Sequence, residues 1–75
     1  MANKQYDLAG QGGIQEFTNL PEGTKLTLTN GAVGEVTANP NDGAYVLVKF
    51  QEHPDSSKVG EEVFVFFNEV KTAEG

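Results

Sequence analysis

The sequence contains no cysteine, no arginine and no tryptophan, and it has no long uninterrupted apolar run. Without cysteine the chain has no disulfide, no thiolate metal ligand and no thiol nucleophile, which suits a reducing compartment. No apolar run approaches the length of a transmembrane helix, and the N-terminal residues lack the apolar stretch of a signal peptide. These absences predict a cytoplasmic protein that does not enter a membrane.

The absence of arginine weighs against nucleic acid as a partner. Arginine makes two-point contacts with phosphate and guanine that lysine cannot copy. The chain also has eleven acidic residues against five lysines, which gives a net charge of −6. Nucleic acids and anionic membranes are both bound through basic surfaces. We therefore expect a protein partner rather than nucleic acid or a membrane.

The central part of the chain, residues 24–50, predicts three consecutive β-strands separated by two turns. Leu26 and Leu28 alternate with polar residues, as in a strand with one buried face. Asn30-Gly31 predicts a tight hairpin turn, because both residue types tolerate positive φ. The stretch 39–43, rich in asparagine, proline and glycine, predicts the second turn. Gly34 interrupts the alternation of the second strand and indicates a β-bulge.

Two more strands are expected after a polar loop at residues 51–60. The fourth strand spans residues 61–67, a single 3₁₀ turn follows at 68–70, and a short last strand ends at residue 72. A chain of 75 residues forms one domain. Residues 1–13 are polar and dense in glycine, so they are expected to be a flexible N-terminal segment. Residues 14–75 are expected to form the folded domain.

This order of elements resembles an SH3-like barrel. Gly31, Gly34 and Val36 resemble the glycine-x-x-glycine-x-valine core of KOW-type modules. Residues 23–71 look like the barrel of the photosystem I accessory subunit. They are also similar to the type II dihydrofolate reductases and to the nitrile hydratase β-subunit domain. The resemblance implies an all-β fold, a small five-stranded SH3-like barrel with a 3₁₀ turn before the last strand.

The functions of these relatives transfer poorly to this chain. Type II dihydrofolate reductases form one active site at the centre of a tetramer, from a valine-glutamine-isoleucine-tyrosine strand that follows a histidine-proline loop. The matching residues are Val63-Phe64-Val65-Phe66 after His53-Pro54, so phenylalanine replaces both the glutamine and the tyrosine. True SH3 domains hold polyproline peptides in an aromatic groove that usually includes tryptophan, which this chain lacks.

No residue pattern in the sequence indicates catalysis. His53 is the one residue able to act as a general base near neutral pH, but a lone histidine without cysteine makes a poor metal site. We interpret it as a solvated loop residue. Glu61 and Glu62 are adjacent, so in a strand they point to opposite faces and cannot work as a pair. We expect no catalytic residue, no cofactor and no bound metal.

The third and fourth strands are apolar on both faces, although a lone barrel has only one inside. The residues expected inside are Val46, Val48, Phe50, Val63, Val65 and Phe67. Four residues are left pointing outward and are the candidate partner-binding residues: Tyr45, Leu47, Phe64 and Phe66. Either a second protein surface covers them, or Leu8, Ile14 or Phe17 folds back over them.

Two functions from different classes are consistent with this pattern. The hypothesis we favour is a small non-catalytic protein-interaction module that self-associates or docks on a larger assembly through its apolar face. The alternative is an oligomeric small-molecule-binding protein or enzyme, of the type II dihydrofolate reductase kind, with a pore between barrels.

Overall fold

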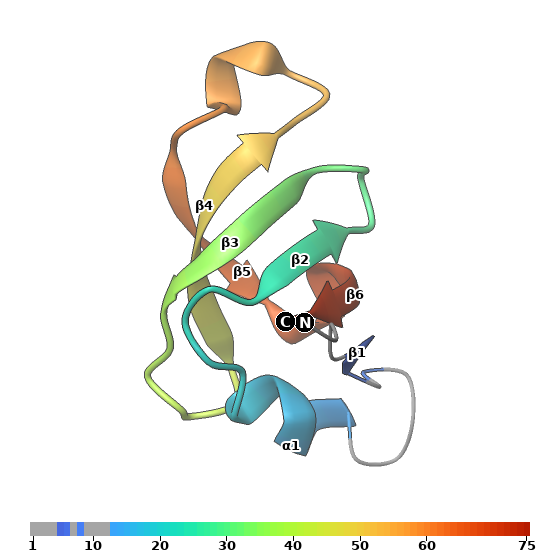
Figure 1. The fold of residues 1–75 in the computed structure, drawn as a ribbon, viewed down its shortest axis with the longest axis vertical. Helices are drawn as coiled ribbons and strands as arrows, with labels where there is room; N and C mark the ends of the chain where they lie inside the picture. Colours follow the sequence, from blue (N-terminus) through green and yellow to red (C-terminus); the bar gives the residue numbers. More distant parts are fainter. Residues whose placement is uncertain (1–4, 7, 9–12) are drawn as a thin grey trace.

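Six antiparallel strands form one sheet in the computed structural model, which describes Gln5, Tyr6, Leu8 and residues 13–75 (Figure 1). The elements in chain order are β1 Gln5–Tyr6, α1 Gly13–Thr18, β2 Lys25–Leu28, β3 Val33–Ala38, β4 Tyr45–Glu52, η1 Ser56–Lys58, β5 Glu62–Phe66, η2 Phe67–Glu69 and β6 Val70–Glu74. The strands lie in the order β1-β6-β2-β3-β4-β5. Among the described strands, β1 and β5 stand at the two ends and do not pair with each other, so the sheet is open. The predicted all-β class is confirmed.

The first turn shows why β2 and β3 form a hairpin. Gly31 has a φ of 92°, a conformation that glycine adopts without steric cost. The Asn30 side-chain oxygen accepts the N–H of Ala32 at 2.9 Å, and the N–H of Leu28 donates to the Ala32 carbonyl at 2.8 Å. The predicted turn therefore lies where the sequence places it. The predicted bulge does too, because the β3–β4 register shifts between Val33 and Gly34.

The second turn joins β3 to β4 and also fixes α1. The Asn39 side-chain amide donates to the carbonyls of Thr18 and Leu20, at 3.1 and 2.8 Å, and the Asn41 amide donates to the Thr18 carbonyl at 2.8 Å. Carbonyls at a helix end have no partner within the helix, so these asparagines satisfy them. A helix of six residues is not stable alone in water, and α1 therefore depends on this turn and on its packing.

Asn39→Ala is expected to lower the free energy of unfolding by about 1–3 kcal/mol, because it leaves the Leu20 carbonyl without its donor and the Thr18 carbonyl with Asn41 as its remaining side-chain donor. Asn39→Asp is the sharper variant, since it keeps the oxygen that accepts the N–H of Asn41 but turns a carboxylate toward the Thr18 and Leu20 carbonyls. Urea denaturation followed by circular dichroism measures both. An Asn39→Asp protein as stable as wild type would contradict this account of the turn.

The apolar core lies on the inner face of the curved sheet. It consists of Leu8, Phe17, Leu20, Leu26, Leu28, Ala32, Val36, Val46, Val48, Phe50, Val65 and Ala73, with Tyr6, Val63, Phe67 and Val70 packed against it. Six residues of the third and fourth predicted strands were expected inside: Val46, Val48, Phe50 and Val65 are buried, and Val63 and Phe67 are half-buried. The predicted inner face of these two strands is therefore correct.

Several predicted boundaries need correction. The loop at 51–60 is partly regular, because β4 continues to Glu52 and η1 forms within it. The fourth predicted strand, β5, ends at Phe66, one residue earlier than expected. Phe67 instead begins η2 and packs against the core. The last strand extends to Glu74 because β2 pairs with it along its length. A sixth strand, β1, adds to its other side, with Gln5 opposite Glu74.

The predicted flexible segment, residues 1–13, lies mostly outside the described residues. The described members have defined places: Gln5 and Tyr6 form β1, Leu8 is buried, and Gly13 begins α1. The division at residue 13 stays a prediction. Within the described residues, no helix is both long and apolar enough to cross a membrane. The expected cytoplasmic location is likewise untested.

Candidate interaction surface

The four candidate residues meet on one face of the β4–β5 hairpin. In the register of the two strands, Tyr45 lies opposite Phe66 and Leu47 lies opposite Phe64. Residues two apart in a strand point to the same face, and pairs directly opposite one another have neighbouring side chains. Since Val46, Val48 and Val65 between them point into the core, this face is the outer one. We call Tyr45, Leu47, Phe64 and Phe66 the outer patch.

The rings of the outer patch pack on one another and remain open to solvent. Tyr45 contacts Phe64 edge to face, with ring centroids 4.7 Å apart, and lies 6.0 Å from the ring of Phe66. Phe64 is 58% exposed and Phe66 is 51% exposed, while Tyr45 and Leu47 are half-buried. Single exposed apolar residues are ordinary, but a contiguous group rich in aromatic residues is typical of a binding surface.

The residues expected to cover this face from within the chain lie elsewhere. Phe17 is fully buried and packs edge to face on Phe67 at 5.5 Å, and Leu8 belongs to the same core. Ile14, also on α1, is itself 58% exposed. Helix α1 thus covers the open end of the core, near the turn between β3 and β4 (Figure 1). In the described part of the chain, neither Phe64 nor Phe66 has an internal cover.

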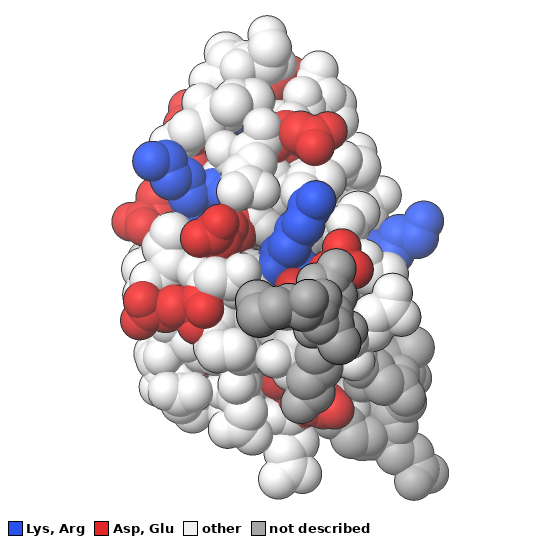
Figure 2. All heavy atoms as spheres, viewed as in Figure 1, with Lys and Arg blue, Asp and Glu red and all other residues white. Residues whose placement is uncertain are grey.

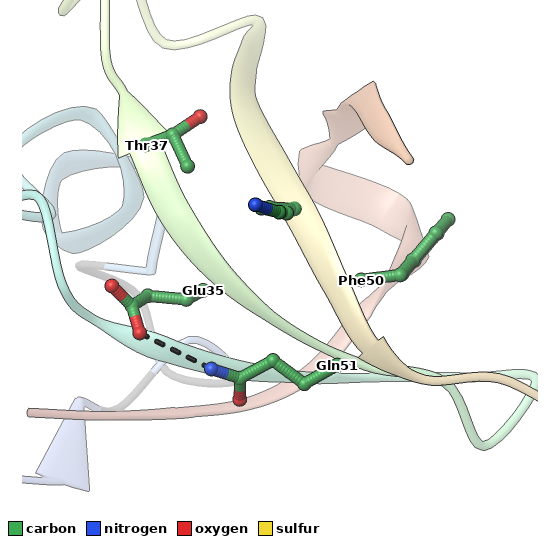
Figure 3. A pocket seen from close by; sticks show the side chains of 5 residues that line it. Glu35, Thr37, Phe50 and Gln51 are labelled. Carbon is green, nitrogen blue, oxygen red and sulfur yellow. Dashed lines mark hydrogen bonds between the residues drawn. The ribbon is translucent and has the colours of Figure 1, made fainter. Parts of the chain in front are cut away.

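Polar side chains continue the same outer face beyond the patch. A hollow of about 310 Å³ is lined by Glu35, Thr37, Lys49, Phe50 and Gln51. Figure 3 shows the side chains of Glu35, Thr37 and Gln51 on one side of the two strands, while Phe50 points the opposite way. Gln51 donates to Glu35 at 3.2 Å, and the Thr37 hydroxyl donates to the Glu62 carboxylate at 2.6 Å. These groups satisfy one another, so the hollow is a polar border to the patch.

The residues of this polar border are not among the candidate residues predicted from the sequence. The signal for it was available in the alternation of β3 and β4, which places Glu35, Thr37, Lys49 and Gln51 on the face opposite the core. The contact between Thr37 and Glu62 could not be foreseen, because it spans β4 and depends on the pairing of three strands.

The loop that carries His53 is organised by its own hydrogen bonds. The backbone N–H of Asp55 donates to His53 Nδ1 at 2.9 Å, and the His53 ring packs edge to face on Phe50 at 4.8 Å. This bond occupies the lone pair of Nδ1, which is then unavailable to a metal or a substrate. The hydroxyl and the backbone N–H of Ser57 donate to the Asp55 carboxylate and hold the pKa of Asp55 below its usual value. The geometry is that of a capped turn.

The histidine and acidic side chains of the described residues do not gather into a metal site. Within the described ranges, no group of three or more histidine and acidic side chains lies close enough to hold a metal ion. On the face drawn in Figure 2, the lysines lie apart from one another with acidic side chains among them, and they form no continuous basic surface. Among the described residues, the outer patch is the group in which exposed aromatic side chains pack on one another.

No protein-family model matches the chain, and no curated protein and no solved structure is significantly similar to it.

Proposed function

We propose that this chain is a small non-catalytic protein-interaction module that binds a protein partner, either a second copy or a larger assembly, through the outer patch. The observation that carries the proposal is the exposure of Phe64 and Phe66 at the edge of the sheet, packed against Tyr45. A phenylalanine side chain buries 150–250 Å² when fully covered. At their exposed fractions the two rings leave roughly 160–270 Å² of apolar surface in water, worth about 4–7 kcal/mol before the costs of association.

The scaffold of the proposed module is an SH3-like barrel. Support comes from the chain order of β2 to β6, with the long connection between β4 and β5 and the 3₁₀ turn η2 before the last strand. Support also comes from the pairing of β6 with β2, which places the last strand beside the first of the three central strands. In this arrangement β4 and β5 present one face to the core and the other to a partner.

The double variant Phe64→Thr, Phe66→Thr tests the proposal. Threonine keeps the strand preference of the two positions while removing the rings, so the fold should persist and binding should be lost. Affinity-tagged chain is incubated with untagged chain and, separately, with an extract of the native cells. Wild type is expected to retain a partner in at least one experiment, and the double variant to lose it.

Val59→Thr is the matched control, because Val59 is 48% exposed but lies in the loop before β5 rather than in the outer patch. It should retain the same partner as wild type. Retention by the double variant of everything that wild type retains would contradict the proposal. So would a wild-type chain that stays monomeric and retains nothing.

A further inference from the structure

The far edge of β5 has backbone groups that point away from the sheet. The N–H of Phe50 donates to the Glu61 carbonyl at 2.9 Å, and the ladder continues with Val48 opposite Val63 and Val46 opposite Val65. Because backbone groups alternate along an antiparallel strand, residues 61, 63 and 65 face β4 and residues 62, 64 and 66 face outward. Among the described strands, none pairs with this outward edge.

The acidic residues Glu62 and Glu69 lie near the outward edge of β5, but their carboxylates do not cover its centre at Phe64. The Glu62 carboxylate accepts a hydrogen bond from Thr37 on β3, so the side chain reaches back over β4 and away from the edge. The Glu69 carboxylate accepts the N–H of Phe66 at 2.9 Å, which caps one end of the edge. An exposed edge strand is a template for pairing with another chain unless charge or covering protects it. Here the backbone of Phe64 lies between the two acidic residues.

We propose that β5 pairs antiparallel with β5 of a second copy of this chain, which makes the sheet continuous across a two-fold axis at Phe64. The inference rests on the proposed function and names the partner and the mode of binding. The strand β5 supplies both the outward backbone groups and the exposed rings of Phe64 and Phe66. The same surface can therefore form the contact in each of the two copies. That is the requirement for a two-fold symmetric interface.

The register centred on Phe64 suits the charges of the chain. It places Glu62 opposite Phe66 of the second copy, so the two Glu62 residues lie about 14 Å apart along the strand direction. That separation exceeds the Debye length of about 8 Å at physiological salt. Lys49 is also the β4 partner of Glu62 in the register, and it brings an opposite charge to each of these sites. Repulsion between the two Glu62 carboxylates is therefore weak, and the Glu69 carboxylate on the N–H of Phe66 is the acidic group that lies beside Glu62 of the second copy.

The size of the contact predicts a weak dimer. The exposed surface of the two rings, roughly 160–270 Å² in each copy, is well below the ~800 Å² that each partner buries in a stable interface of standard size. Backbone hydrogen bonds between the two β5 strands add to it. Monomer and dimer should therefore exchange at micromolar to millimolar concentrations.

The first test is analytical ultracentrifugation of the full chain across this concentration range. The variant Glu62→Pro tests whether dimerisation depends on the outward edge of β5. The Glu62 N–H faces away from β4, so proline removes no bond within the sheet but blocks the approach of a second strand. Glu62→Ala is the matched control, because it also loses the bond to Thr37. We expect dimerisation at least about tenfold weaker in Glu62→Pro, and close to wild type in Glu62→Ala.

Amide hydrogen exchange gives an independent result that needs no variant. The Phe64 N–H should become more protected as the concentration of wild type rises, because it becomes bonded only in the dimer. The N–H groups of Val63 and Val65 face β4 and should be protected at every concentration. Exchange at Phe64 that does not change while the chain dimerises would overturn strand pairing.

The outcomes separate this inference from the proposed function. A wild-type chain that is monomeric at all concentrations overturns the second copy as partner, while the retention experiment still decides on other partners. A dimer that Phe64→Thr, Phe66→Thr abolishes and Glu62→Pro leaves intact shows packing of the outer patches face to face. That result overturns the pairing of β5 and supports the proposed function.

Discussion

Replacing Phe17 by alanine is expected to lower the free energy of unfolding by about 3–5 kcal/mol. Phe17 is completely buried in the core, and its ring packs edge to face on Phe67 at 5.5 Å. A domain of 75 residues has a total stability of about 4–11 kcal/mol, so this single change should remove a large part of it. The large cost follows because α1 has no stability of its own and holds its place through this side chain.

Ile14→Ala is the control for Phe17→Ala, because it removes an apolar side chain from the same short helix. Ile14 is 58% exposed, so its loss should change the stability by about 0.5 kcal/mol or less. Thermal and urea denaturation of both variants measure the difference. Equal effects at the two positions, or a Phe17→Ala protein within about 1 kcal/mol of wild type, would show that α1 is not part of the core.

The central strands could be predicted because their signals are local. Asn30-Gly31 and the stretch 39–43 specify reversals within a few residues, and the alternation of apolar residues between them assigns each side chain to a face. The same reasoning located the outer patch, because side chains alternate between the two faces of β4 and β5, and this alternation decides which residues point away from the core. Phe64 and Phe66 were expected to be exposed because the alternating residues Val63, Val65 and Phe67 were assigned to the core.

The N-terminal elements could not be predicted because their causes are not local. The strand β1 has two residues and no periodicity, and it exists because the outer edge of β6 accepts it. The helix α1 is short and begins at a glycine, and it forms because Asn39 and Asn41 both donate to the carbonyl of its last residue, Thr18, and because Phe17 fills the core. The sequence shows Leu8 and Phe17 as apolar, but it cannot show that they are directed inward rather than over the outer patch.

Gly34→Ala is expected to destabilise the protein by about 1–3 kcal/mol through a steric clash. Gly34 is buried in β3, where the register with β4 shifts. A methyl group there would meet Cγ1 of Val48 and would lie 3.0 Å from the carbonyl oxygen of Lys49. Replacing glycine by alanine also restricts the unfolded chain, which is worth about 0.4–1 kcal/mol of stability in favour of alanine. The clash should outweigh this gain, since both contacts belong to the packed interior of the sheet.

A double-mutant cycle with Val48→Ala identifies the cause. Removing the Val48 methyl groups makes room for the new side chain, so Gly34→Ala should cost clearly less in the Val48→Ala protein than in wild type. Gly31→Ala is the contrasting variant, because Gly31 has open space around it and a φ of 92°. Its cost comes from the backbone and should be the same in both backgrounds. Equal costs of Gly34→Ala in the two backgrounds would show that β3 and β4 do not approach each other closely at Gly34.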